Sequence, residues 1–183
     1  MMPEISLNIL DVAQNSVTAG ALLTEISISV DNAADTLEVV ISDNGRGMSA
    51  EQSAQAADPF FTTRTTRKVG LGLPFLKMAA EMTGGSFGIT SVPGSGTRIA
   101  AVFGLTHIDR MPMGDIAGTM TSLIGPNPDV DFILRYFVDG GGFELDTREM
   151  RIVLEGIPLR EPEVLNYITG FINENIDAAG SRY

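Results

Sequence analysis

Asp43-Asn44-Gly45-Arg46-Gly47-Met48 directly follows an alternating apolar run over residues 37–42. The run predicts a strand, so Asp43 is expected at the strand's end, ahead of a glycine-rich turn. A carboxylate there can accept a hydrogen bond from the exocyclic amine of a purine, and glycines without Cβ let the backbone approach the ring. Because a strand followed by a glycine-rich turn is common, this interpretation depends on the rest of the chain.

Length and composition bound the class of protein. The 183 residues, 44% of them hydrophobic, suit one globular domain, or one domain with a substantial extension. The absence of cysteine and the single histidine exclude disulfide frameworks and Cys- or His-rich metal centres. No apolar run approaches the length of a membrane span and no basic leader precedes residue 10. We therefore expect a cytoplasmic protein with no membrane partner.

The charge distribution indicates an anion rather than nucleic acid as ligand. The net charge is −11, whereas generic nucleic-acid binding needs a basic surface. No Lys or Arg precedes Arg46, yet Arg64, Arg67 and Lys68 fall within one short, Thr-rich loop. We expect this loop to contact an anion. A solvated charged loop is the alternative when these residues are considered alone.

Periodicity predicts an order of helix, two strands, helix, loop, helix and hairpin. Helices are expected over residues 6–19, 50–57 and 71–83, and strands over residues 25–30, 37–42, 87–92 and 97–105. This order implies an α/β (α+β) two-layer sandwich, in which a mixed sheet carries its helices on one face.

Local signals set the expected boundaries. Ser6 is the predicted N-cap of the first helix and Gly20 its C-terminal stop. Ser49 and Gln52 form a capping-box signature for the second helix. The expected buried face of the first helix comprises Leu7, Leu10, Ala13 and Val17.

The pattern changes after residue 105, so we divide the chain into residues 1–105 and a C-terminal α/β extension, 106–183. The extension is expected to contain a helix over 113–124, strands over 131–138, 142–146 and 151–154, and an amphipathic helix over 161–176. We expect it to pack against the first unit, although a separate subdomain stays open. Its role as a partner-docking surface, a dimer interface or a support for the basic loop is also open.

Asp11 and Asn15 lie four residues apart, on one face of the first expected helix. An amide oxygen beside a carboxylate suits hydrated Mg²⁺ and a polarised water. The alternative is two polar residues on a solvated helix face.

Gly70 and Gly72 put backbone amides at a helix N-terminus after the basic loop, where phosphate is favoured.

The full set of motifs resembles a known family. The set comprises Asn15, Asp43-x-Gly45-x-Gly47, Asp58-Pro59-Phe60-Phe61, Gly70-Leu71-Gly72-Leu73 and Gly94-Ser95-Gly96-Thr97. Together, over roughly residues 5–105, they look like the Bergerat-type ATP-binding domain of DNA gyrase, heat-shock chaperones, sensor histidine kinases and mismatch-repair ATPases. The stretch from Pro59 to Leu73 is most similar to the histidine-kinase branch.

The resemblance implies a role for each matching residue. Asn15 would ligate the Mg²⁺ that accompanies ATP, and Asp43 would accept from the adenine amine, with Thr97 reaching adenine through water. The remaining implied ATP contacts are Gly45, Gly47 and Met48 around the base, Phe60 and Phe61 at the lid, and Arg64, Arg67, Lys68, Gly70, Leu71 and Gly72 toward the phosphates.

The resemblance places Asp11 at the position where family members that hydrolyse ATP have a Glu, which acts as the general base on water. Asp has one fewer methylene, and about 1 Å of misplacement can cost on the order of a hundredfold in rate. We therefore expect slow hydrolysis or none, with Asp11 serving as a general base or as an orienter of an incoming hydroxyl.

We favour a stand-alone signalling module that binds Mg²⁺-ATP and is similar to anti-sigma-factor serine kinases, with phosphate transfer to a protein partner as its enzymatic variant. A slow ATPase switch and a non-enzymatic interaction domain are the alternatives, and a homodimer stays open. His107 does not resemble a phosphoacceptor motif and is expected to be structural or on the surface.

Overall fold

The apolar alternation around Asp43 forms the centre of a six-stranded sheet. The structure is a computed structural model that describes residues 4–58 and 72–180. The sheet has the order β3-β4-β2-β1-β5-β6. Its strands are β1 (Leu23–Asp31), β2 (Thr36–Asp43), β3 (Ser86–Val92), β4 (Gly96–Gly104), β5 (Asp131–Val138) and β6 (Gly141–Asp146). All neighbours pair antiparallel except β1 and β5, which are parallel. The predicted mixed sheet is confirmed.

Register aligns the buried residues of neighbouring strands in rows. Ile41 of β2 lies opposite Ile26 of β1 and Ile99 of β4. All three side chains are at most 5% exposed. Because side chains alternate along a strand, every second residue faces the same layer, and the apolar set of each strand is buried together.

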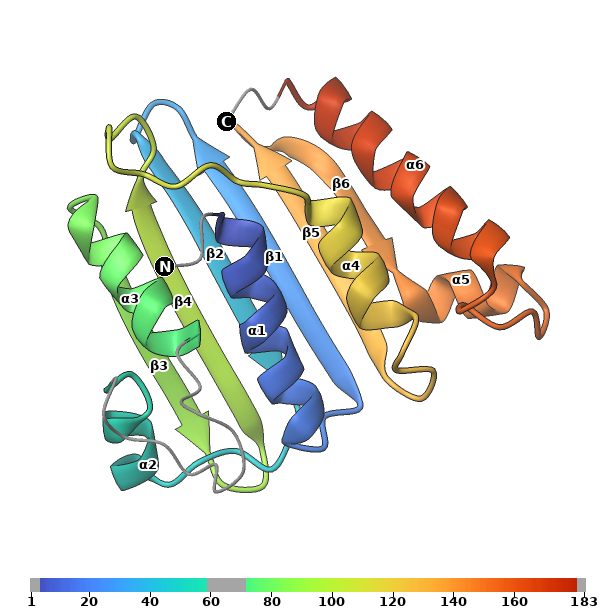
Figure 1. Ribbon diagram of the computed structural model, residues 1–183, viewed down its shortest axis with the longest axis horizontal. Helices are drawn as coiled ribbons and strands as arrows, with labels where there is room; N and C mark the ends of the chain where they lie inside the picture. Colours follow the sequence, from blue (N-terminus) through green and yellow to red (C-terminus); the bar gives the residue numbers. More distant parts are fainter. Residues whose placement is uncertain (1–3, 59–71, 181–183) are drawn as a thin grey trace.

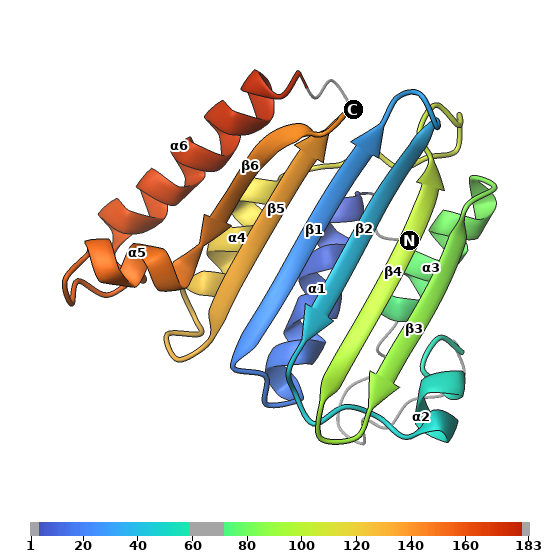
Figure 2. The same cartoon turned by 180° about the vertical axis from the view of Figure 1, so that it is seen from behind.

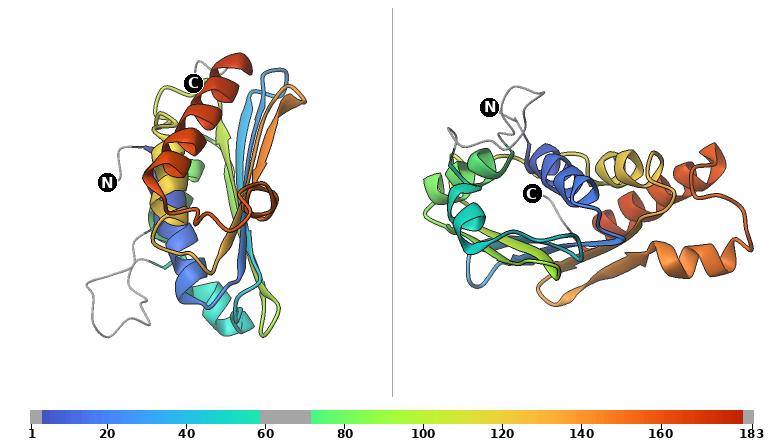
Figure 3. Two further views of the ribbon diagram at one scale, coloured as in Figure 1. Left: turned by 90° about the vertical axis from the view of Figure 1, so that its right-hand side faces the viewer. Right: turned by 90° about the horizontal axis from the view of Figure 1, so that it is seen from below.

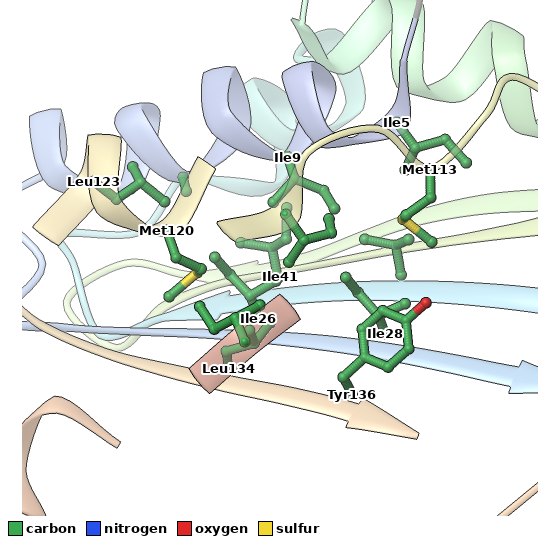
Figure 4. Packing of buried hydrophobic residues seen from close by; sticks show 14 of the residues in the cluster. Ile5, Ile9, Ile26, Ile28, Ile41, Met113, Met120, Leu123, Leu134 and Tyr136 are labelled. Atoms are coloured by element: carbon green, nitrogen blue, oxygen red, sulfur yellow. The ribbon is translucent and has the colours of Figure 1, made fainter. Parts of the chain in front are cut away.

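The helices that bury this face all lie on one side of the sheet (Figure 3, left; Figure 2 shows the sheet from the other side). They are α1 (Ile5–Thr18), α3 (Gly72–Met82), α4 (Ile116–Ile124) and α6 (Pro162–Ala178), while the short α2 (Ala50–Gln55) and α5 (Thr147–Val153) lie at the sheet's ends (Figure 1). In Figure 4, Ile9 of α1 and Met120 of α4 point toward the strands at Ile26. The predicted two-layer sandwich with helices on one face is confirmed.

The first helix differs from its prediction in its cap and in its buried face. Glu4 is the N-cap and Ser6 lies inside the first turn, where its hydroxyl donates to Glu4 Oε2 at 3.3 Å. The buried face is not the predicted one and shares only Ala13 with it; its members are Ile5, Ser6, Asn8, Ile9, Val12, Ala13 and Ser16. Gly20, with φ 76°, follows the end of the helix as predicted.

The predicted strand over 151–154 is wrong, because the segment is helical. Asp146 caps α5 by accepting from the Arg148 N–H at 2.9 Å. Ile152 and Val153, which suggested a strand, are 77% and 80% exposed on this helix. The helix predicted over 113–124 begins later, at Ile116, because Asp115 caps it.

The extension continues the same sheet. β5 pairs with β1 from Leu23↔Asp131 to Val30↔Val138, α4 packs against α1, and α6 packs against α4. The expected packing against the first part of the chain is therefore observed, while the division at residue 105 into two units stays a prediction. Within residues 4–58 and 72–180, no helix combines the length and apolarity needed to cross a membrane.

Candidate functional site

At one end of the sheet, the rows of buried apolar side chains are followed by a row of polar side chains. Along β2, the core-facing series Leu37, Val39 and Ile41 ends in Asp43. Asp43 pairs with Thr97 of β4, and Thr97 pairs with Ser91 of β3. Since residues directly opposite each other share a face, the three polar side chains lie side by side at one end of the sheet, on the face that carries the helices.

The Asp43 carboxylate is fixed by two donors. Ser16, on α1 and 3% exposed, donates its hydroxyl to Asp43 Oδ2 at 2.7 Å. The Gly45 N–H donates to Asp43 Oδ1 at 2.9 Å. A carboxylate has about four lone-pair sites, so each oxygen keeps capacity for a further donor. The carboxylate is therefore oriented and can still accept a hydrogen bond.

The two glycines of the turn allow close backbone approaches. A Cβ on Gly47, where φ is 67°, would lie 2.0 Å from the Val92 carbonyl oxygen. A Cβ on Gly45 would lie 3.0 Å from Asp43 Oδ1 and 3.1 Å from Ala19 Cβ. The protein's own packing against the end of α1 and the β3–β4 hairpin accounts for glycine at both positions, while the approach of these glycines to a purine ring stays a prediction.

On the β3 side of this polar row, hydrogen bonds of hydroxyl and backbone groups join the glycine turn to the β3–β4 hairpin. Ser91 Oγ lies 2.8 Å from Thr97 Oγ1 and accepts from the Met48 N–H at 2.8 Å. The Gly94 N–H donates to the Arg46 carbonyl oxygen at 2.7 Å. These contacts hold the glycine turn against the hairpin and bring Met48 and Thr97 to the same side of the site, while their roles toward a ligand stay predictions.

Asp11 lies at the beginning of α3. A Cβ on Gly72 would meet Asp11 Oδ2 at 1.9 Å, so a larger residue there would require the Asp11 carboxylate to move away from the helix start. Ser16, which holds Asp43, follows Asp11 by five residues on α1, about 7.5 Å along the helix axis at 1.5 Å per residue. Asn15 lies on the same helix, half-buried, one residue before Ser16.

The remaining predicted residues fall in two groups. Phe60, Phe61, Arg64, Arg67, Lys68, Gly70 and Leu71 lie outside the described residues. His107 lies in the exposed turn after β4, where its Nδ1 accepts from the Asp109 N–H at 3.2 Å. Arg148 and Arg151, on α5, pair within the chain with Asp146 and Asp131 at 2.6 and 2.9 Å.

Sequence reasoning missed Ser16 and Ser91. Both have a recognisable signal, because each is a polar residue in a core-facing series. Ser16 continues the helical series of Ile9, Val12 and Ala13, and Ser91 lies two residues beyond Ile89 on β3, on the same face of the strand.

The residues present fit a nucleotide with its metal. Among residues 4–58 and 72–180, no group of three or more His, Cys, Asp and Glu side chains could hold a metal ion. A metal in this region would therefore take most of its ligands from a nucleotide and water, as Mg²⁺ does with phosphates. The Asp43 carboxylate, which keeps acceptor capacity beside the two hydrogen bonds it receives, suits the amine of a purine base.

Comparisons with known proteins identify the family to which the chain belongs. Residues 4–107 match the family model described as histidine kinase-, DNA gyrase B-, and HSP90-like ATPase. The sensor protein DegM of Bacillus sp. is 30% identical over 91 residues, which cover 50% of this chain and 24% of that protein. The sensor histidine kinase ZraS of Klebsiella oxytoca is 33% identical over 89 residues, covering 48% of this chain and 19% of that protein.

Solved structures show the same fold. The MutL ATPase domain of Aquifex aeolicus, complexed with ADP, superposes with a TM-score of 0.50 at 13% sequence identity, covering 85% of this chain and 70% of that chain. This chain spans about a quarter or less of the curated relatives it matches first, 13%, 24% and 23% of their lengths. The family membership itself implies nucleotide binding, and the predicted resemblance is confirmed: the chain belongs to the family of histidine kinase-, DNA gyrase B- and HSP90-like ATPases.

Proposed function

We propose that this chain is a regulatory module that binds Mg²⁺-ATP and transfers the γ-phosphate to a partner protein in the cytoplasm. The observation that carries the proposal is the Asp43 carboxylate, held by Ser16 and Gly45 with acceptor capacity left over. An oriented anion at the end of a strand selects a donor, and the exocyclic amine of adenine is such a donor. Guanine carries a carbonyl oxygen at that ring position and would be disfavoured.

The position of Asp11 supports a bound metal. A phosphate at the N-terminus of α3 would stand close to the Asp11 carboxylate, which lies against Gly72. Two anions at such a distance repel unless a cation lies between them. Mg²⁺ bound to the nucleotide would supply that cation, with Asn15 as the expected amide ligand. The contributions of Arg64, Arg67 and Lys68 to phosphate binding stay predictions.

A slow ATPase is the second candidate, and the same Asp11 position favours it. A carboxylate beside a phosphate site can orient water as well as a hydroxyl. Because Asp is shorter than Glu, we expect water attack to be slow. Transfer and hydrolysis therefore share one carboxylate and differ in the nucleophile that it orients.

The experiment that tests transfer follows the γ-phosphate. Wild type and Asp11→Asn are incubated with γ-labelled ATP, with and without an extract of the source cells. Phosphate transfer predicts label on a protein with the wild type and loss of that label with Asp11→Asn. Release of free phosphate that is lost in Asp11→Asn would favour the ATPase. If ATP binds but neither a labelled protein nor free phosphate appears, the function is that of an ATP-dependent switch.

A further inference from the structure

A hollow lies at the β6 edge of the sheet, away from the Asp43 site on β2. It has a volume of about 1040 Å³ and lies among the end of β6, α5 and the first half of α6. We call it the C-terminal groove. Its sides present Val153, Ile157 and Tyr167, which are 80%, 54% and 65% exposed, and its floor includes the buried Leu145 and Val164. Figure 3 (right) shows α5 and α6 at this end of the molecule.

A stack of aromatic rings fixes one wall of the groove. Tyr167 stacks on Phe171 with ring centroids 6.4 Å apart, and Phe171 meets Phe143 edge-on at 5.7 Å. Phe143 in turn stacks on Tyr136, which is 1% exposed, at 6.0 Å. The exposed Tyr167 ring is thus anchored to the core and loses little freedom on binding a partner. Tyr in such a setting is typical of residues that dominate interface energies.

The rim of the groove is acidic. The lining includes five carboxylates and no Lys or Arg; they are Glu144, Asp146, Glu149, Glu161 and Glu163. Glu144 pairs with Arg135 and Asp146 with Arg148. Among the described residues, no Lys or Arg forms an ion pair with the other three. The groove therefore combines an apolar floor with a net negative rim.

This chemistry indicates which occupant fits. A second copy of the chain would bring a net charge of −11 toward the acidic rim. Its described helices carry only three basic residues, Lys77, Arg148 and Arg151, and both arginines are paired within the chain. A strand added to β6 would meet only its last three residues, 144–146, within the groove. An apolar channel between two helices is instead the usual receptor for an amphipathic helix.

We propose that the C-terminal groove binds a basic amphipathic helix of a partner protein. Its apolar side chains contact Val153, Ile157 and Tyr167, and its Lys or Arg side chains lie against Glu149, Glu161 and Glu163. Asp43 and Ser91 are on β2 and β3, whereas the groove is at the β6 edge of the sheet. Partner binding can therefore be measured without ATP, and failure of the ATP site leaves this inference standing.

The test is a selection from a phage-displayed library of random peptides, about five helical turns long. Selection is on the wild-type chain, with counter-selection on Tyr167→Ala. The enriched peptides should have excess Lys and Arg and apolar residues at helical spacing. Fluorescence anisotropy then gives the Kd of the best peptide, which should weaken about tenfold or more in Tyr167→Ala. Glu163→Lys should weaken it about fivefold, less so at high salt.

Two exposed control variants keep the result specific. Ile108→Ala, at a position that is 93% exposed and not part of the groove, and Glu51→Lys on α2 should bind the peptide as the wild type does. Circular dichroism checks that every variant is folded. The proposal would be overturned if the selection enriched no peptide, or if the enriched peptides had no excess of Lys and Arg. Apolar residues at every second position, or equal binding to the wild type and Tyr167→Ala, would also overturn it. So would a wild-type dimer in sedimentation equilibrium that Tyr167→Ala dissociates.

Discussion

Replacing Ser16 with Ala tests whether the held orientation of Asp43 matters for the ligand. The change removes one hydroxyl, which donates to Asp43 Oδ2 at 2.7 Å, from a helix position that is 3% exposed. The Gly45 N–H still holds the other carboxylate oxygen at 2.9 Å. The Asp43 carboxylate therefore keeps its charge and one of two donors, and it gains freedom to rotate.

The structure sets the expected size of the effect. A hydrogen bond to a charged group contributes about 1.5–3 kcal/mol, and Asp43 is half-buried, so the low end applies. We expect the free energy of unfolding to fall by about 1.5 kcal/mol. If the lost orientation must be restored when ATP binds, the Kd rises by about tenfold, since 1.4 kcal/mol corresponds to one factor of ten.

Ser6→Ala is the matched control. Ser6 is also a buried serine of α1, 1% exposed, but its hydroxyl donates to Glu4 at the other end of the helix. Isothermal titration calorimetry gives the Kd, and urea unfolding gives the stability of each variant. An ATP affinity of Ser16→Ala within twofold of the wild type, or an equal loss in Ser6→Ala, would refute the reasoning.

Further variants test the close backbone approach at Gly47 and the loss of folding stability at acid pH. Gly47→Ala and Gly94→Ala both place Ala at positive φ, 67° and 76°, but only at position 47 does the new Cβ meet backbone, 2.0 Å away. In urea unfolding, Gly94→Ala should lose about 1–2 kcal/mol and Gly47→Ala about 1–3 kcal/mol more, and equal losses would contradict the close approach. The hydrogen bond from Arg148 lowers the pKa of the Asp146 carboxyl in the folded protein, so the stability it adds is present above the unfolded-state pKa and is lost as pH falls through the folded-state pKa. Asp146→Asn should therefore make the loss of stability on acidification less steep, and a loss as steep as that of the wild type would contradict this reasoning.

The parts of the fold that depend on local signals could be predicted from the sequence. The capping box of α2 forms with both bonds, Gln52 N–H to Ser49 Oγ at 3.2 Å and Ser49 N–H to Gln52 Oε1 at 2.9 Å. The two central strands follow from their alternation, and Asp43 lies at the end of β2 as expected. In each case the residues that decide the structure are neighbours in the sequence.

The N-terminus of α1 depends on distant residues and could not be predicted in this way. The N–H groups of Ile5 and Ser6 donate to the carbonyl oxygens of Pro112 and Met113 at 3.0 and 2.8 Å. These bonds satisfy N–H groups that a capping side chain would otherwise serve. Ser6 is therefore free to lie inside the helix, and nothing near it in the sequence indicates the partner loop.

The misassigned segment at α5 shows a competition between two signals. Asp146 and Glu149 stand three apart, as an N-cap and an acidic first-turn residue do. The apolar residues Ile152, Val153 and Leu154 suggested a strand instead. Ile152 and Val153 are largely exposed because α5 lies at the end of the sheet beside the C-terminal groove, whereas Leu154 is partly buried against the core. Apolar residues that serve a surface cannot be told from core residues by sequence alone.

The contacts around Asp43 were predicted in part. The carboxylate and its glycines follow from their spacing, whereas Ser16 and Ser91 come from elements 27 and 48 residues away in sequence. Their partner distances, 2.7 Å to Asp43 and 2.8 Å to Met48 N, arise only when the layers pack. Packing, and not spacing, turns an aspartate at a strand's end into an oriented acceptor.

The measurement that tests the central claim most directly is calorimetric titration of Mg²⁺-ATP into the wild type and Asp43→Asn, with the exposed Asp109→Asn as control. The account predicts one site on the wild type and on the control. It predicts a Kd about 10- to 100-fold weaker in a folded Asp43→Asn, because a hydrogen bond to a charged acceptor is lost. A folded wild type that does not bind ATP, or an Asp43→Asn variant that binds as tightly as the wild type, would contradict the account.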